Sequence, residues 1–527
     1  MITVLIPTAG VGSRLGTITD NFNKALIPIG KKPSISYIID YYPKDTKFII
    51  ALGFRGNDVR EFLELAYPDL DITFVEIENY NGEGSGLGLT LKSCEPFINS
   101  SFFFHANDTI ITDKFDWSCF HKNTLFLNDI YIDPKSYVTA SINRKDASVE
   151  KLYPKTLESI DNPLSYIGIA YIEDYLDFKK KLKELDLGLT ESDYFINYCN
   201  HNELQFINTK SWYDIGDIEK YRIAISELSN FDNLLKEDET IYFIDDKVIK
   251  FFKDKTIITD RIKRAKVLKG LVPKLVDTRK NFYSYDYVPG VLMSELPEIE
   301  TEMEKFLIWS KNNLWKEKKL DKVELKKFEK VCHNFYYEKT LSRINKFFDK
   351  FEIKDKEYVI NGHKQKKFEH IIRNIEWEII TKTIPTGFHG DLHFENILKT
   401  GSGYSLLDWR QNFGGLIDYG DMYYDLAKLN HGLIISHSII KEKLFNITIQ
   451  GKQIYFDFNR KNNLMKAQVK FNQFLEKNNL SKYKVDILTN LIFLNIAALH
   501  TYPYSIFLYF LGIFGLNEAI LSNKEYE

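Results

Sequence analysis

The sequence predicts an α/β protein of two domains: a mostly parallel sheet with helices on both faces, then a small β-rich part followed by a large helical part. Three observations predict this division. Strand-like and helix-like segments alternate over the first half, a polar connector lies at residues 226–239, and long helical patterns dominate after residue 290. The predicted domains span residues 1–230 and 238–527, and the second divides at about residue 290 into parts 238–290 and 291–527.

The composition is that of folded domains and excludes several classes of protein. Of the 527 residues 44% are hydrophobic and 27% charged, and the 70 Lys and Arg nearly balance the 73 Asp and Glu. No basic run is long enough to follow a nucleic-acid backbone, so nucleic acid is not an expected partner. The four cysteines are scattered and the N-terminus lacks a signal-peptide pattern, which predicts a cytoplasmic protein.

The most apolar stretch lies near the C-terminus, at residues 491–516, and is interrupted by Asn495, His500 and Pro503. The run after Pro503 is shorter than the roughly 20 residues that a membrane span needs. We therefore expect buried helices there and no stable membrane insertion.

Four short runs of β-branched and aromatic residues are the predicted strands of the first domain. They lie at residues 3–8, 47–54, 71–77 and 101–108, with amphipathic segments such as 58–66 between them. Parallel sheets bind ligands at the carboxyl ends of their strands. The glycine turn AGVGSRLG, directly after the first strand, is therefore expected at the ligand-binding edge.

This turn has the composition of a phosphate-binding loop. Ala9, Gly10 and Gly12 would let backbone N–H groups approach a phosphate chain, and Arg14 and Lys24 would supply positive charge. A dinucleotide-binding turn is the competing interpretation, but that turn needs a third glycine at a spacing that this chain, with Ser13, Arg14 and Leu15 after Gly12, does not have.

Roughly the first 225 residues resemble the sugar-nucleotide pyrophosphorylase and cytidylyltransferase family. The resemblance rests on the glycine turn, NKALIPIGKKPSISYII (23–39), GEGSGLG (82–88), HAND (105–108) and WYDIGDIEKYRIA (212–224). It implies a Rossmann-like nucleotidyltransferase sheet. It also implies that Arg14 and Lys24 are catalytic and that Ser85 and Gly86 bind the nucleotide together with the glycine turn.

The same resemblance implies that Asp108 and Asp214 hold one Mg²⁺, which would neutralise the α-phosphate under attack and the departing pyrophosphate. Taken singly, these residues would also suit strand ends or helix caps, and Lys24 a solvated surface. One position departs from the family. Where relatives carry a Glu-Lys-Pro whose lysine meets the acceptor phosphate, this chain reads SIDNP (159–163).

The second half begins with TIYFIDDKVIKFF (240–252), two β runs around an Asp-Asp turn, which predicts a hairpin with Lys250 on its second strand. NFYSYDYVPG (281–290) predicts another strand, ending at a Pro-Gly break. A small β-rich lobe, a hinge and a large helical lobe are the outline of a two-lobed, kinase-like fold.

HGDLHFENIL (389–398) and LLDWR (406–410) resemble the aminoglycoside phosphotransferase and choline kinase family. The resemblance implies a protein-kinase-like (α+β) domain. Asp391 would be the catalytic aspartate, Asn396 and Asp408 would hold Mg²⁺, and Lys250 would bind the α- and β-phosphates of ATP.

Some positions depart from this second pattern or are ambiguous. The helix after the hairpin has no Glu to pair with Lys250, and Arg410 stands where many relatives have an acidic residue. We expect His389 and His393 to shape the loop by hydrogen bonds, and Asp425 to tie the loop to a helix.

Together the two resemblances imply a bifunctional enzyme. The second domain would phosphorylate a small hydroxyl compound with ATP, and the first would couple the product to a second nucleotide, CTP before UTP or GTP, with release of pyrophosphate. The product would be an activated headgroup for a surface polysaccharide such as a capsule.

The sequence leaves several candidates for the compound that is phosphorylated. A sugar or polyol is favoured slightly over an amino alcohol, because GEGSGLG is typical of the sugar-phosphate branch of the family. Choline or ethanolamine kinase joined to a phosphocholine-type cytidylyltransferase is one alternative. An inactive, regulatory domain in one half of the chain is another.

Overall fold

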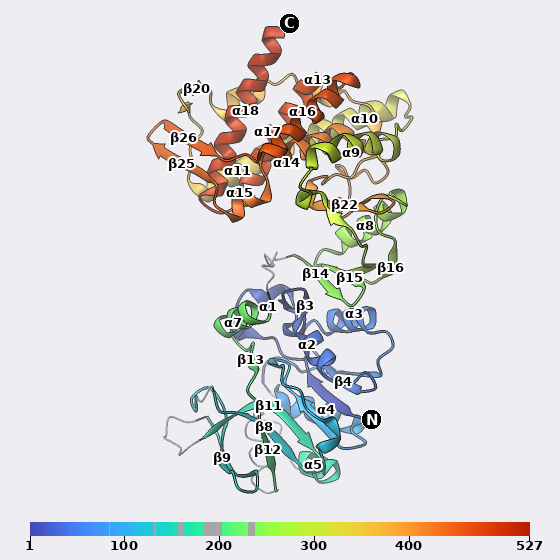
Figure 1. Ribbon diagram of the computed structural model, residues 1–527, viewed down its shortest axis with the longest axis vertical. Helices are drawn as coiled ribbons and strands as arrows, with labels where there is room; N and C mark the ends of the chain where they lie inside the picture. The colour runs from blue at the N-terminus through green and yellow to red at the C-terminus, as the bar shows by residue number, and fades with distance from the viewer. Residues whose placement is uncertain are drawn as a thin grey trace. The chain divides into compact units, whose positions relative to one another are not determined.

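The computed structural model describes residues 1–83, 85–130, 133–155, 163–183, 198, 203–229 and 238–526 (Figure 1). Gly84 of the GEGSGLG loop and residues 159–162 of the SIDNP segment lie outside this description. The chain divides into two compact units. The first comprises Met1–Lys255 and Val276–Asp286, and the second comprises Thr256–Leu275 and Tyr287–Glu527.

The described part of the first unit contains a nine-stranded sheet with strand order β5-β4-β1-β6-β11-β8-β12-β10-β9. Strands β5, β4, β1 and β6 are parallel, as the alternating pattern predicted, whereas β11 is antiparallel to β6 and β8. The sheet is therefore mixed, and the expected parallel order holds for its first four strands. The strands are β1 Thr3–Pro7, β4 Lys47–Leu52, β5 Ile72–Glu76, β6 Phe102–His105, β8 Thr124–Asn128, β9 Thr139–Asn143, β10 Ser148–Tyr153, β11 Leu164–Ile172 and β12 Gln205–Asn208.

Helices cover both faces of this sheet because successive side chains of each strand point to opposite sides. Val4 and Ile6 are buried in one core with residues of α2 and α3, while Leu5 is buried in a second core with residues of α4 and α5. The helices are α2 Ser34–Tyr41, α3 Gly56–Ala66, α4 Leu87–Cys94, α5 Tyr175–Lys183 and α7 Ile218–Leu228.

A second, four-stranded sheet has the order β14-β15-β17-β16, formed by Glu239–Ile244, Lys247–Phe252, Phe282–Asp286 and Leu275–Thr278. The Asp-Asp turn joins β14 to β15, with Asp245 in the left-handed region at φ 48°. The sequence predicts this hairpin, with Lys250 on its second strand. Lys250 is 5% exposed and lies opposite Ile241 and Tyr283 in the sheet.

This four-stranded sheet shares its hydrophobic core with the first unit. The Tyr242 hydroxyl donates a hydrogen bond to the Leu26 carbonyl at 2.6 Å. The ring centre of Phe62, on α3, lies 5.1 Å from the ring centre of Tyr242 and 6.3 Å from that of Phe282. The contacts group these strands with the first unit, whereas the sequence assigns them to the small lobe of the second domain. The boundary at residues 230 and 238 stays a prediction.

The second unit is mainly helical; its described part also has a two-stranded pair, β21 Pro385–Thr386 with β24 Gly420–Asp421, and two sheets of three and four strands. Its longer helices are α8 Lys255–Val267, α9 Ile299–Asn313, α10 Lys322–His333, α11 Lys339–Phe351, α14 Met422–Ile434, α16 Asn462–Lys477, α17 Lys482–Ala497 and α18 Tyr504–Tyr526. Shorter ones are α12 Phe368–Arg373, α13 Trp377–Thr381 and α15 His437–Lys441. One sheet, β18-β22-β23, contains Val291–Leu292, Ile397–Thr400 and Gly403–Leu406; the other, β20-β19-β26-β25, contains His363–Gln365, Tyr358–Ile360, Gln453–Phe458 and Phe445–Gln450.

Helix α18 is longer than the sequence predicted, because it continues beyond the apolar run into a polar end. Among the described helices it is the one whose length and composition would suit a membrane span, over Tyr504–Asn523. Within its most apolar part 61% of the residues are buried inside the unit, and α17 and α18 belong to the same core. Burial of this kind is also typical of a core helix in a protein outside the membrane.

The shared core of α3 and the four-stranded sheet is testable through Phe62, which is fully buried. We expect Phe62→Ala to lower the free energy of unfolding by about 3–5 kcal/mol, because it leaves a cavity between these elements. Hydrogen exchange should show α3 and β14 losing protection together. Phe97→Ala, at a ring that is 40% exposed, is the control and should cost under about 0.5 kcal/mol. Full protection of β14 in the Phe62 variant would contradict a shared core.

Candidate functional site

The glycine turn follows β1 at the edge where the parallel strands end. Phe54 donates its backbone N–H to the Ala9 carbonyl at 2.9 Å, which fixes the start of the turn against the end of β4. Gly53 is required at this contact, because a Cβ there would lie 2.6 Å from the Ala9 oxygen. Gly12 has φ +74°, a conformation that side chains disfavour, so the turn keeps its open backbone.

The turn borders a cavity of about 330 Å³, which we call the glycine cavity. The predicted residues that line it are Ala9, Gly10, Gly12, Arg14, Lys24, Gly86 and Asp108. Ser85 is not part of the lining, and its hydroxyl donates to the Gly82 carbonyl at 2.6 Å. The structure thus brings together the glycine turn, the described end of the second glycine loop and the two basic residues.

Lys24 and Asp108 form an ion pair at the base of the glycine cavity, with 2.7 Å between Nζ and Oδ2. Their side chains are 12% and 29% exposed. Burial disfavours the charge of Asp108, but the cations of Lys24 and Arg14 outweigh it and lower the pKa of Asp108. Asn23 fixes the turn that carries Lys24, since its side chain accepts the Ala25 N–H at 2.8 Å.

Asp214 reaches Asp108 through a short two-stranded sheet. Strand β7, Thr109–Ile111, pairs antiparallel with β13, Trp212–Asp214, and the Ile215 N–H donates to the Asp108 carbonyl at 2.9 Å. A Cβ placed on Gly216 would lie 2.8 Å from Asp214 Oδ1 and 3.5 Å from Asp108 Oδ2. The glycine therefore leaves an open space between the two carboxylates.

This space fits a hard cation such as Mg²⁺, which prefers carboxylate oxygens and takes further oxygens from phosphates and water. Among the described residues no group of three or more His, Cys, Asp and Glu forms a metal cage. Asp108 and Asp214 would thus supply two of the ligands, and a bound nucleotide would supply others.

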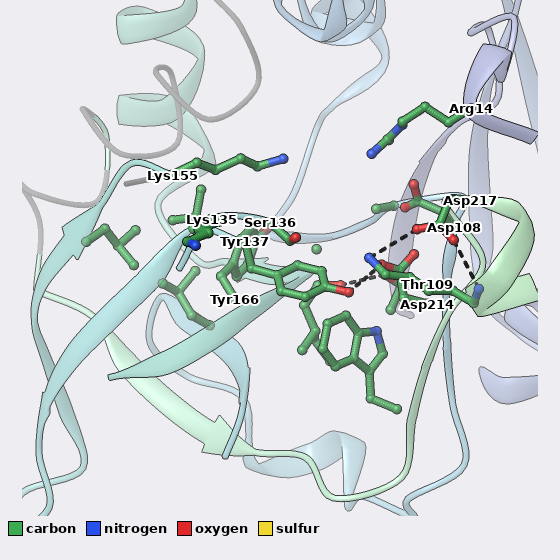
Figure 2. A pocket seen from close by; sticks show the side chains of 18 residues that line it. Arg14, Asp108, Thr109, Lys135, Ser136, Tyr137, Lys155, Tyr166, Asp214 and Asp217 are labelled. Carbon is green, nitrogen blue, oxygen red and sulfur yellow. Dashed lines mark hydrogen bonds and ion pairs between the residues drawn. The ribbon is translucent and has the colours of Figure 1, made fainter. Parts of the chain in front are cut away.

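A second cavity of about 370 Å³ also has Asp108 in its lining (Figure 2). It shares Arg14, Ala106 and Asp108 with the glycine cavity. We call it the lysine cavity, because its lining includes Lys135, Lys155 and Lys220. In Figure 2, Lys155 and Arg14 reach toward each other from opposite sides.

Sequence reasoning did not single out Tyr137 and Lys220, although both hold Asp214. The Tyr137 hydroxyl donates to Asp214 Oδ2 at 2.6 Å, and Lys220 Nζ lies 2.8 Å from the same oxygen. Lys220 follows Asp214 within the WYDIGDIEKYRIA segment, so its place on the first turn of α7 was available as a signal. Tyr137 belongs to a segment without a motif, and only the fold brings it to the site.

In the second unit, Asp391 lies on the loop of the HGDLHFEN segment and faces Lys428 of α14. Lys428 Nζ lies 2.8 Å from Asp391 Oδ1, and His393 Nε2 lies 3.7 Å from the other oxygen. Burial opposes the charge of Asp391, yet Lys428 and His393 hold the pKa of Asp391 well below its usual range. Asn396 closes the loop by donating its side-chain N–H to the Asp391 carbonyl at 3.0 Å.

Asn396 and Asp408 lie at the same end of the hairpin formed by β22 and β23. Ile397 pairs with Leu406, and the Leu407 N–H donates to the Asn396 carbonyl at 2.8 Å. Asp408 then takes a left-handed conformation with φ 56°. The three predicted residues of this loop and hairpin are thus neighbours within the second unit. Lys250 belongs to the first unit, and its role toward ATP stays a prediction.

The two histidines and Asp425 have the structural contacts that the sequence led us to expect. Asp425 accepts the backbone N–H groups of His389 and Gly390, both at 2.7 Å, and the indole N–H of Trp315 at 3.1 Å. Burial lowers the pKa of His389 to about 3, so this ring is neutral. His393 bonds the Glu395 carboxylate at 2.9 Å, and although burial opposes its charge, Glu395 raises the pKa of His393.

Helix α8, which has no Glu, carries two arginines that contact the motif segments of the second unit. Arg261 Nη1 lies 3.1 Å from Asp408 Oδ1. Arg264 is fully buried and donates to the carbonyls of Phe388, Ile417 and Arg410, at 2.5, 2.9 and 3.4 Å. The helix is therefore fixed to both motif segments of the second unit.

Arg410 packs against neighbouring residues of the second unit. Its guanidinium lies 5.1 Å from the centre of the Phe335 ring, and its Nε donates to the Asn412 carbonyl at 3.1 Å. Gly390 is required beside it, because a Cβ there would lie 2.6 Å from the Arg410 Cβ. These contacts give Arg410 a role in packing the loop.

The ion pair of Lys24 is testable through the pH dependence of stability. Because the pKa of Asp108 is lowered on folding, the pair stabilises the protein above the ordinary carboxyl pKa of 3.8, and this contribution is lost as pH falls through the lower folded-state pKa. We expect Lys24→Met to cost about 1–2 kcal/mol at pH 7 and less below pH 3.8, measured by urea unfolding. Lys32→Met, at the more exposed pair with Asp40, is the control. An equal cost at both pH values would rule out the pair as the cause.

Arg264 offers a test of how α8 is attached. We expect Arg264→Met to lower the free energy of unfolding of the second unit by at least about 3 kcal/mol, because three carbonyls lose a buried donor. Thermal or denaturant unfolding measures this loss. Lys263→Met, one residue away with a side chain that is 58% exposed, should have little effect. A similar small effect for both variants would mean that water replaces the guanidinium.

Comparisons with known proteins concern part of the chain. No protein-family model matches it. The chain is 24% identical over 216 residues to the bifunctional protein GlmU of Methanococcus maripaludis strain S2, which covers 40% of this chain and 51% of that protein. A second strain, C7, has a GlmU with the same identity and coverage. The chain thus spans about half the length of the curated relatives it matches.

Solved structures of similar proteins align with a comparable share of the chain. A UDP-glucose pyrophosphorylase complexed with UDP-glucose has a TM-score of 0.38 and 17% identity, covering 43% of this chain and 98% of that one. The CTP:phosphocholine cytidylyltransferase of Streptococcus pneumoniae has a TM-score of 0.36 and 16% identity, covering 43% and 99%. The N-terminal part of the chain resembles nucleotidyltransferases.

Proposed function

We propose that the first unit is a nucleotidyltransferase that joins a phosphomonoester to a nucleoside triphosphate and releases pyrophosphate. The observation that carries this proposal is that two cavities meet at Asp108 and Arg14. A triphosphate in the glycine cavity and a phosphomonoester in the lysine cavity would then be adjacent at the carboxylate pair. The resemblance of the N-terminal part to nucleotidyltransferases supports the same reaction.

In this reaction an oxygen of the phosphomonoester attacks the α-phosphorus, and the bond from that phosphorus to the pyrophosphate oxygen breaks. Arg14 and Lys24 would hold the triphosphate and balance the negative charge that grows on the leaving pyrophosphate. Asp108 and Asp214 would hold Mg²⁺, which when bound supplies further charge neutralisation at the α-phosphate. Tyr137 and Lys220 keep Asp214 in place through its Oδ2 atom.

We further propose that the second unit is a small-molecule kinase that makes the phosphomonoester from a hydroxyl compound and ATP. Two features support this: Asp391 lies on a loop that Asn396 closes, and Asn396 and Asp408 stand together at the hairpin end, where oxygen ligands of this kind suit Mg²⁺. The two reactions would follow one another, with CTP as the favoured nucleotide of the second step.

The final product would be a nucleotide-activated sugar, polyol or headgroup, of the kind that serves surface polysaccharide synthesis. An inactive, regulatory second unit is the second candidate. The observation that favours it is the Arg261 guanidinium at 3.1 Å from Asp408, where the kinase would need a carboxylate open to Mg²⁺.

Phosphorus NMR of the full-length protein with Mg²⁺, ATP and CTP tests both steps when sugars, polyols, choline and ethanolamine are supplied in separate tubes. We expect Asp391→Asn to lose phosphomonoester formation by about 100-fold or more, and Asp108→Asn to let the monoester accumulate without a diphosphodiester. Asp69→Asn, at an exposed position, is the control. If wild type forms no monoester but converts an added one, the second unit is not a kinase; if Asp108→Asn retains transfer, the site assignment is wrong.

A further inference from the structure

We propose that the lysine cavity selects a phosphomonoester whose organic part is uncharged, and that Tyr137 and Lys220 exclude a quaternary ammonium group from it. This inference rests on the proposed nucleotidyl transfer and names the class of acceptor. The observations that carry it are the pairing of charges around the cavity and the contact made by the face of the Tyr137 ring.

The carboxylates of the lysine cavity already have cationic partners. Asp108 pairs with Lys24 at 2.7 Å, while Asp214 and Asp217 both pair with Lys220, at 2.8 and 3.4 Å. Lys24 and Lys220 supply two positive charges to these three carboxylates, so one negative charge remains among them for the other cations of the cavity to balance.

The remaining cations of the cavity give it a surplus of positive charge. Arg14, Lys135 and Lys155 line it and form no ion pair with any residue in the described ranges. Lys135 and Lys155 are exposed, so both side chains are accessible to a ligand from solvent. Figure 2 shows Lys155 and Arg14 reaching in from opposite sides, a geometry suited to a dianionic phosphate between them. A phosphate bound there would lie near Asp108, where the α-phosphate of the triphosphate is proposed to be.

One aromatic face of the cavity, that of Tyr137, already binds a cation of the protein itself. Recognition of choline-like groups depends on open aromatic faces, with the cation within about 6 Å of the ring centre. Lys220 Nζ lies 4.5 Å from the centre of the Tyr137 ring. The same ring packs edge-to-face with Trp212 at 5.0 Å, and its hydroxyl is bound to Asp214. A second cation at this face would be repelled by the Lys220 ammonium.

Three probes separate charge from shape: choline phosphate, its neutral carbon isostere 3,3-dimethylbutyl phosphate, and glycerol 1-phosphate. Isothermal titration calorimetry of the full-length protein with Mg²⁺, with and without α,β-methylene-CTP, measures their affinities. We expect the neutral isostere to bind about tenfold tighter than choline phosphate, the effect of one like-charge contact at partly exposed sites. Glycerol 1-phosphate, which can use the polar lining, should bind tightest.

Three variants test which side chains discriminate between the probes. Lys220→Met keeps the length of the side chain without its charge and should reduce the difference between choline phosphate and its isostere to about threefold or less. Lys155→Met should weaken all three probes alike, because it removes a contact to the shared phosphate. Lys32→Met, a lysine outside the cavity lining, should change neither the order nor the ratios.

The outcomes of this experiment and of the NMR experiment are independent. Equal affinities for choline phosphate and the neutral isostere would overturn the charge selection even if nucleotidyl transfer were observed. Absence of binding by all three probes would overturn the cavity as an acceptor site. The expected order of affinities without any transfer would leave the selection standing and refute the proposed reaction.

Discussion

The site of the first unit depends on the pairing of β7 with β13. These two short strands place Asp214 beside Asp108, and Gly216 keeps the space between their carboxylates open. Two carboxylates so close would repel each other, and the protein offsets this by giving each a lysine, Lys24 for Asp108 and Lys220 for Asp214. The pair of carboxylates at which the two cavities meet follows from this pairing.

The four-stranded sheet shows how packing, rather than sequence order, decides which unit an element joins. Its strands follow the polar connector and are interrupted by α8 of the helical unit, which makes them look like the beginning of a second domain. Their apolar face needs a partner, however, and α3 and the turn that carries Lys24 supply it through Phe62 and Leu26. Buried hydrophobic area stabilises whichever surfaces fit each other, and that fit cannot be read from a pattern along the chain.

The second unit has the loop and hairpin that its motifs led us to expect, with a different charge arrangement around them. The helix that follows the first hairpin has no Glu; it presents Arg261 to Asp408 and buries Arg264 against backbone carbonyls. Lys428 of α14 supplies the cation next to Asp391. Each of these basic side chains is partly or fully buried, and a buried charge is tolerated only with a partner at short range. Here the partners are carboxylates and backbone carbonyls of the same unit.

The sequence by itself determined the elements and the motif residues whose role depends on local geometry: the strand that precedes the glycine turn, the Asp245 hairpin, and the loop that joins Asp391 to Asn396. Local patterns suffice there because turns, glycines and alternating side chains act over a few residues. Only the tertiary structure decided the antiparallel position of β11, the attachment of the four-stranded sheet, and the roles of Tyr137, Lys135 and Arg264. Those depend on contacts between segments far apart in the chain, where single residues carry no pattern that a sequence reveals.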